Sequence, residues 1–159
     1  MKTMYKKIVL RSMMLLMALG LVFGISSCSR DDDGGGSAKD GDMYKITITL
    51  NGVDANDYVS LSCAASDAAA TTSVWKINGV TQNGQIGVGL NETNFTGSTK
   101  TYVLETNFKV LALAAGGQLI NYGGTITGSY KIEKNGNVEV NETINLSADG
   151  ASWSKQFNF

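Results

Sequence analysis

The sequence contains no histidine, no proline and only two cysteines among its 159 residues. Without histidine the chain lacks the commonest general base and metal ligand, so it can form neither a Ser-His-Asp triad nor a Cys-His pair. The two cysteines, Cys28 and Cys63, could form one disulfide at most. These absences remove much of the chemistry used by hydrolases and zinc enzymes. We therefore expect a protein that is not an enzyme and that holds no metal and no cofactor.

The chain also lacks an apolar stretch long enough to span a membrane. The stretch from Met13 to Ile25 has thirteen residues, whereas a spanning helix needs about 20. Lys2, Lys6, Lys7 and Arg11 lie before or at the start of this stretch. A basic start followed by a short apolar segment is typical of an export signal.

The apolar stretch leads into the tetrad Ile25-Ser26-Ser27-Cys28, which resembles the lipobox of bacterial lipoproteins. The two small serines fit an extended path through a peptidase groove, and the Cys28 thiol is the nucleophile that a thioether requires. The resemblance implies cleavage before Cys28, followed by addition of a diacylglyceryl group and acylation of the new amine. Two or more acyl chains anchor a protein stably in a membrane. The alternative is an ordinary secretory signal with a chance cysteine.

An acidic cluster follows the cysteine closely, at Asp31, Asp32 and Asp33. It is similar to the signal after the cysteine that directs Bacteroidota lipoproteins to the outer face of the outer membrane. The simpler interpretation is a solvated run of charge. The glycine-rich stretch that continues to Asp42 is typical of a flexible linker, and it predicts a tether with a reach of roughly 20 Å.

The predicted domain organisation is a signal peptide over 1–27, a lipidated tether over 28–42 and one domain over 43–159. Loss of the signal removes four of the 13 basic residues, which leaves nine against 14 acidic residues and a net charge near −5. This charge disfavours nucleic acid as a partner. It also disfavours docking on anionic head groups, so the expected membrane contact is the lipid anchor.

The domain shows period-2 alternation of apolar and polar residues almost throughout, with little helical periodicity. Asn78-Gly79 and Asn135-Gly136 are hairpin signals. Short strands separated by Gly, Asn and Asp turns predict a single antiparallel, all-β sandwich of about seven to nine strands. The expected core residues are Tyr44, Ile46, Ile48, Leu61, Trp75, Ile77, Val110, Leu113, Tyr130, Ile132, Val140, Ile144 and Trp153.

Cys63 followed twelve residues later by Trp75 resembles the B-strand cysteine and C-strand tryptophan of immunoglobulin variable domains. The resemblance implies an Ig-like sandwich, although the partner cysteine and the tyrosine corner are missing. Because Cys63 falls on the apolar side of a strand, we expect a buried thiol.

The sequence pattern in the middle of the domain predicts a strand over 108–113. Over 118–122 it predicts either another short strand or a covered connection. Leu111 to Ala115 has helix-forming composition. This stretch is barely one turn long before Gly116-Gly117 breaks it, so we expect no helix there.

Few side chains suggest a binding site. Asp54-Ala55-Asn56-Asp57 offers oxygen atoms that Ca²⁺ accepts, but a full site needs six to eight oxygens, and an Asx turn is the expected structure. The glutamates are expected on strand exteriors or near turns, although a pair of carboxylates could serve a glycosidase. Tyr58, Phe95 and Tyr122 are the aromatic residues expected to stack on a sugar face, and each could instead pack in the core or at an edge.

Two functions fit these observations. The first is a surface lipoprotein of the outer membrane whose sandwich binds glycan or extracellular matrix. The second is a structural or accessory subunit of a surface fimbria or envelope complex, which would accept a partner strand at an unpaired sheet edge. A third arrangement, with the domain facing the periplasm, differs from the first only in topology.

Overall fold

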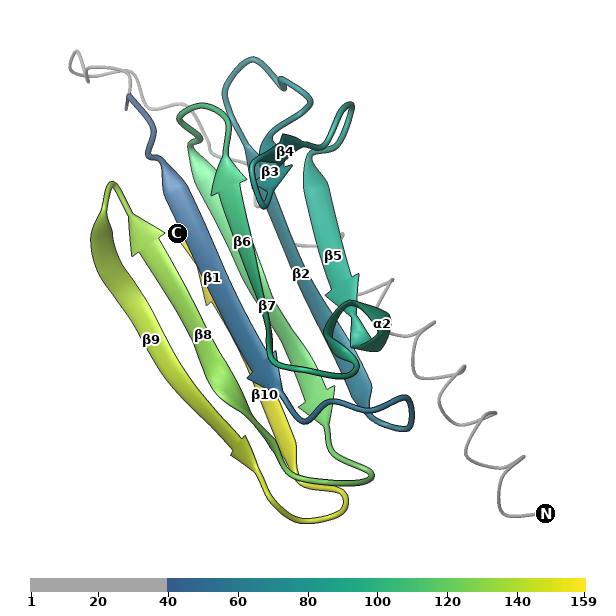
Figure 1. Cartoon of the computed structure of the whole chain (residues 1–159). Coiled ribbons are helices and arrows are strands. Elements are labelled where there is room, and N and C mark those ends of the chain that lie inside the picture. The colour runs from purple at the N-terminus through teal and green to yellow at the C-terminus, as the bar shows by residue number, and fades with distance from the viewer. Residues whose placement is uncertain (1–39) are drawn as a thin grey trace, which may run out of the picture. The chain divides into compact units, whose positions relative to one another are not determined.

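The computed structural model describes residues 40–159, which form an all-β sandwich of two antiparallel sheets (Figure 1). The lipobox and the acidic cluster lie outside the described residues. Within residues 40–159, no helix is long and apolar enough to cross a membrane.

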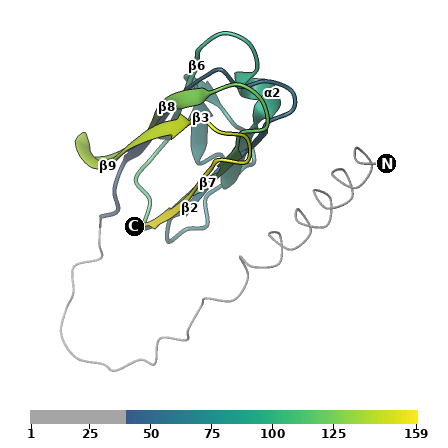
Figure 2. The same cartoon turned by 90° about the horizontal axis from the view of Figure 1, so that it is seen from below.

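The two sheets have six and four strands and lie as separate layers when the domain is viewed along its strands (Figure 2). The larger sheet has the order β4-β3-β6-β1-β8-β9 and the smaller sheet the order β10-β7-β2-β5. The elements are β1 (Tyr44–Asn51), β2 (Tyr58–Ser66), β3 (Trp75–Ile77), β4 (Val80–Thr81), β5 (Gly87–Asn91), α2 (Glu92–Phe95), β6 (Lys100–Thr106), β7 (Ala112–Ile120), β8 (Ile126–Lys134), β9 (Asn137–Leu146) and β10 (Ser152–Asn158).

The core lies between the sheets and is filled by alternate residues of each strand. On β2, Val59, Leu61, Cys63 and Ala65 are buried, while the residues between them are half-buried or exposed. Most of the expected core residues are confirmed. The two exceptions, Ile77 and Val140, are only partly buried and pack against the core.

Both predicted hairpins are confirmed. Asn78 and Gly79 have φ of 49° and 80°, and Asn135 and Gly136 have φ of 50° and 84°, as a type I′ turn requires. The first hairpin joins β3 to β4, two strands of three and two residues. With these short strands the sandwich has ten strands, more than the seven to nine expected.

The predicted strand over 108–113 is wrong in its bounds, and the short strand considered over 118–122 is not separate. A single strand, β7, covers Ala112–Ile120. It includes Gly116 and Gly117, the two glycines that end the helix-forming stretch in the sequence. Gly116 and Gly117 have φ of 150° and 155°. A Cβ on Gly117 would lie 2.1 Å from the backbone oxygen of Ser60 on β2. Glycine is therefore needed within this strand because a side chain would collide with the neighbouring backbone. The expectation of no helix over 111–115 is confirmed.

Candidate functional site

The strands have two distinct ends. At one end, the chain enters the domain through residues 40–43, and Asp42 forms a backbone bridge with Val110. We call this the entry end. At the opposite end lie the connections over 52–57, 92–99, 121–125 and 147–151, which we call the distal loops (Figure 1). A binding surface on loops needs those loops to be held in place.

Asp57 joins two of the distal loops. Its side chain is buried, with the residue only 5% exposed. Its Oδ2 accepts a hydrogen bond of 2.8 Å from the amide of Asp54 in its own loop. Its Oδ1 accepts a second bond of 2.8 Å from the amide of Tyr122, 65 residues away. Bonds from amides to an ionised carboxylate are stronger than neutral ones, so this side chain fixes loop 52–57 against loop 121–125.

Asn121 joins loop 121–125 to the next distal loop. It is fully buried, and its Nδ2 donates to the carbonyl oxygens of Leu146 and Ala148 at 2.8 and 3.2 Å. Its Oδ1 accepts from the amide of Gly123 at 3.0 Å. Together, Asp57 and Asn121 hold three of the four distal loops through polar contacts.

The structure places all three expected ligand-binding aromatics at the distal end, but only Tyr58 and Tyr122 reach the surface. Tyr58 is half-buried on the outward side of β2, where it is opposite Ile120 of β7. Tyr122 follows two residues after Ile120 and is 37% exposed. The two tyrosines therefore lie on adjacent strands or their extensions, at the same end of the smaller sheet.

The expectation that Phe95 contacts a ligand is wrong, because this side chain is fully buried. Phe95 is the last residue of α2, and its ring packs edge-on against Tyr102 at 5.1 Å between centroids. The helix was not expected from the sequence. Its signal is a capping box in which Asn91 and Asn94 each bond to the other's backbone amide.

Asp54 forms the expected Asx turn, in which its Oδ1 accepts from the amide of Asn56 at 2.7 Å. The carboxylate also lies against the neighbouring distal loop, since a Cβ on Gly123 would be 2.4 Å from Asp54 Oδ2. No group of three His, Cys, Asp or Glu side chains within residues 40–159 is arranged to hold a metal ion.

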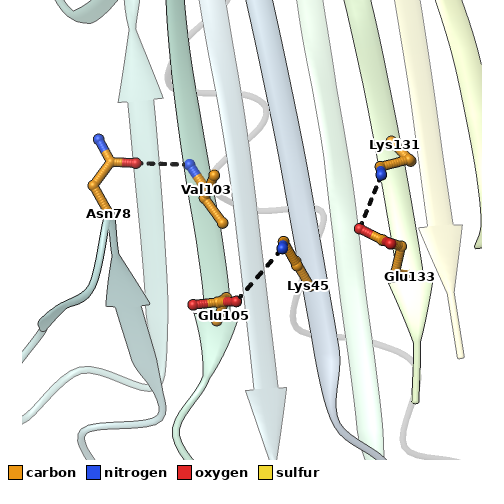
Figure 3. A network of polar contacts seen from close by, with 6 residues as sticks. All are labelled: Lys45, Asn78, Val103, Glu105, Lys131 and Glu133. Atoms are coloured by element: carbon orange, nitrogen blue, oxygen red, sulfur yellow. Dashed lines mark hydrogen bonds and ion pairs between the residues drawn. The ribbon is translucent and has the colours of Figure 1, made fainter. Parts of the chain in front are cut away.

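The outer face of the larger sheet carries a second polar cluster (Figure 3). Lys45 on β1 lies opposite Glu105 on β6 and Glu133 on β8. Its Nζ is 3.9 Å from Glu105, and Glu133 pairs with Lys131 at 3.1 Å. Lys45, Glu105, Glu133 and Lys76 line a hollow at the entry end of this face. Opposite charges alternate across the strands there, which is the ordinary pattern of cross-strand pairs.

Cys63 is buried as expected, with 4% of its surface exposed. Burial raises the pKa of its thiol far above the usual range. A thiol that stays protonated is a poor nucleophile, so Cys63 serves as a small core residue.

No protein family matches the chain at the level of sequence, and no curated protein matches it either. Solved structures do match the fold. A calcium-bound protein from Parabacteroides distasonis, determined by NMR, has a TM-score of 0.55 with 16% identity, over 81% of this chain and 99% of that one. A DUF4425 domain of unknown function from Bacteroides vulgatus has a TM-score of 0.56 with 14% identity, over 76% and 94%. A DUF4425 family protein from Bacteroides ovatus has a TM-score of 0.53 with 13% identity, over 75% and 94%. At these identities, the likeness establishes the sandwich fold alone.

Proposed function

We propose that this protein is a non-enzymatic lipoprotein, anchored in the outer membrane through acylated Cys28, whose distal loops bind glycan or extracellular matrix. The observation that carries the binding proposal is the position of Tyr58 and Tyr122. Both lie at the distal end, and the polar contacts of Asp57 and Asn121 hold the loops there. Rigid loops reduce the entropy lost on binding, and an exposed aromatic ring can stack on the apolar face of a sugar.

The proposed localisation rests on the sequence. Ile25, Ser26 and Ser27 precede Cys28, and Asp31, Asp32 and Asp33 follow it in the order that surface lipoproteins of Bacteroidota use. The matching folds occur in proteins of Parabacteroides and Bacteroides, which agrees with this localisation without testing it. The proposed orientation places the domain on the cell exterior.

Protease shaving of intact cells tests whether the domain is exposed on the cell surface. The native protein should be degraded, and a variant with Asp31, Asp32 and Asp33 all replaced by Ala should be protected. Protection of the native protein would contradict surface exposure and would direct the search for partners to the periplasm.

Binding of the full chain to a panel of polysaccharides and matrix proteins tests the site. Tyr122→Ala removes the ring but keeps the backbone amide that Asp57 accepts, so the loop contact survives. It should weaken binding at least about tenfold, which corresponds to ~1.4 kcal/mol. Val80→Ala is the matched control, because Val80 is 65% exposed and lies on β4, away from the distal loops. Equal binding by both variants would contradict a distal-loop site.

The structural role in a fimbria or envelope complex is a second candidate, and β9 favours it. β9 is the longest strand, with ten residues, and lies at an edge of the larger sheet, where it pairs with β8. An edge of this length can accept a strand from a partner. Size-exclusion chromatography of the purified chain separates the candidates: concentration-dependent assembly supports this role, and a monomer that binds polysaccharide supports the first.

The P. distasonis protein was solved in a calcium-bound form, and in this chain Asp54 and Asp57 are the carboxylates that the sequence suggested for such an ion. Ca²⁺ takes six to eight oxygen ligands. Both oxygens of Asp57 already accept amide hydrogen bonds, and one oxygen of Asp54 does. This donor set does not fit a complete calcium site, so the proposed function does not include the ion.

A further inference from the structure

The entry end carries an unusual share of exposed apolar side chains. Among residues 40–159, six large hydrophobic side chains are exposed. Met43, Ile86, Leu111 and Val138 lie at or beside the entry end, whereas Val80 is on β4 and Tyr122 is in the distal loops. Scattered exposed hydrophobic residues are normal on a protein surface, but a group at one end indicates a contact.

Backbone hydrogen bonds show that Ile86 and Leu111 are neighbours, and the chain path places Met43 at the same end of the domain. The carbonyl oxygen of Ile86 accepts from the amide of Ala65 at 3.1 Å, and the amide of Leu111 donates to the carbonyl of Ser66 at 2.8 Å. Ile86 and Leu111 therefore flank the end of β2, two strand spacings or about 10 Å apart. Met43 follows Asp42, whose backbone bridges to Val110, the residue before Leu111. The side chain of Met43 lines the hollow on the outer face of the larger sheet. We call Met43, Ile86 and Leu111 the entry patch.

The charges around the entry patch are balanced within the domain, since two lysines and two glutamates line the hollow beside Met43 and two further ion pairs lie close by. Lys134 lies 2.8 Å from Asp42, and Lys109 lies 3.8 Å from Asp40. Paired charges leave little net field at this end. An apolar or neutral interfacial partner therefore suits the patch better than a strongly charged one.

The patch is also the part of the domain next to the proposed lipid anchor. The described chain enters at this end, and Asp40 is twelve residues after Cys28. Even a fully extended chain of twelve residues spans at most about 43 Å. The acyl chains on Cys28 would thus keep a bilayer within reach of the entry patch at all times.

We infer that the entry patch docks on the membrane surface, so that the domain stands on the bilayer with its distal loops pointing outward. This inference rests on the proposed anchor at Cys28. Apolar side chains of surface-bound proteins lie ~5–10 Å into the boundary between head groups and acyl chains. Contacts by Met43, Ile86 and Leu111 at that depth would restrict the domain to one orientation, which the tether alone would not impose.

The two native tryptophans allow a direct test, because Trp75 and Trp153 are 0% and 7% exposed. A tryptophan introduced at the surface therefore reports on its own surroundings. The full lipidated chain is reconstituted in phosphatidylcholine vesicles with and without lipids brominated on the acyl chains. Leu111→Trp places the probe in the entry patch. Tyr122→Trp is the matched control at the distal end, separated from the patch by a strand length of about 27 Å.

The added fluorescence of Leu111→Trp should be quenched by brominated lipid at least about twofold more than that of Tyr122→Trp, since only the former reaches the acyl boundary. Equal, weak quenching of both variants on vesicle-bound protein would overturn the docking while leaving the anchor intact. A blue-shifted but unquenched Leu111→Trp would also overturn it and would indicate that a second copy of the chain covers this end. Failure of the native chain to co-sediment with vesicles would contradict the anchor itself, and the docking with it.

Discussion

The two ends of the sandwich are held together by different kinds of polar contact. At the distal end, the buried side chains of Asp57 and Asn121 bond to backbone groups of three loops. At the entry end, the half-buried pair Asp42–Lys134 joins two side chains that are each about one third exposed. Water competes weakly for the first set and strongly for the second. The distal loops are therefore held by two buried polar side chains, whereas the entry end combines a partly exposed ion pair with one buried bond, from the amide of Tyr44 to Thr106 Oγ1.

Phe95→Ala, which removes a ring beneath the distal loops, is the substitution expected to lower the free energy of unfolding most. Phe95 is fully buried against Tyr102, and removing its ring should lower the free energy of unfolding by about 3–5 kcal/mol. Tyr122→Ala, at a site that is 37% exposed in the same set of loops, should cost less than Phe95→Ala. Urea denaturation of both variants measures the difference. Similar losses would mean that Phe95 is not part of the core.

Asn121→Ala should give the next largest effect. The substitution leaves the buried carbonyl of Leu146 and the amide of Gly123 without their partners. An unsatisfied buried group costs about 1–3 kcal/mol, so we expect a loss of about 2–4 kcal/mol in the free energy of unfolding. Amide exchange should also become faster at Gly123 and Ala151, whose loops Asn121 joins. Unchanged exchange there would contradict the role of Asn121 in fixing the distal loops.

Alternation of apolar residues and the two Asn-Gly turns were enough to predict the all-β sandwich and most of its core, because these signals act through neighbouring residues. The errors arose where distant contacts decide the structure. The sequence predicts that Gly116-Gly117 ends a helix-forming run, but it does not reveal that the close approach of β2 and β10 requires glycine inside a continuous strand, β7. Asp57 was expected only to form a local turn, and its bond to Tyr122 depends on a residue 65 positions away. Phe95 was misassigned because the sequence did not reveal that a short helix would turn it inward.

At the entry end, the Asp42–Lys134 pair should shift the pKa of Asp42 measurably but contribute little to the free energy of unfolding. The side-chain bonds from Lys134 and Asn135 lower the pKa of Asp42 below its ordinary 3.8. Because the folded pKa is depressed, the pair contributes stability above pH 3.8, and this contribution is lost as pH falls through the lower, folded value. NMR titration of the Asp42 carboxyl should show this, and Lys134→Met should move the pKa upward toward 3.8.

Asp67 is the control for this titration. Its pKa is also lowered, by side-chain and backbone hydrogen bonds from Thr71, and Lys134→Met should leave it in place. An upward shift of both carboxyls would indicate a general change in the domain and would contradict a specific pair at Asp42.

The smallest expected effect concerns calcium at the distal loops. A ligand that binds the folded state stabilises it by RT ln(1 + [L]/Kd), so millimolar Ca²⁺ without a complete site should raise the Tm by less than about 1 °C over a chelator control. Differential scanning fluorimetry of the full chain and of Asp54→Asn measures this. A rise of several degrees in the native chain, lost in Asp54→Asn, would contradict our interpretation of the donor set. It would also show that Asp57, despite its two amide bonds, rearranges to share its carboxylate with an ion. The distal loops would then be less rigid than the contacts of Asp57 and Asn121 indicate. The difference in rigidity between the two ends of the sandwich would depend on whether calcium is bound.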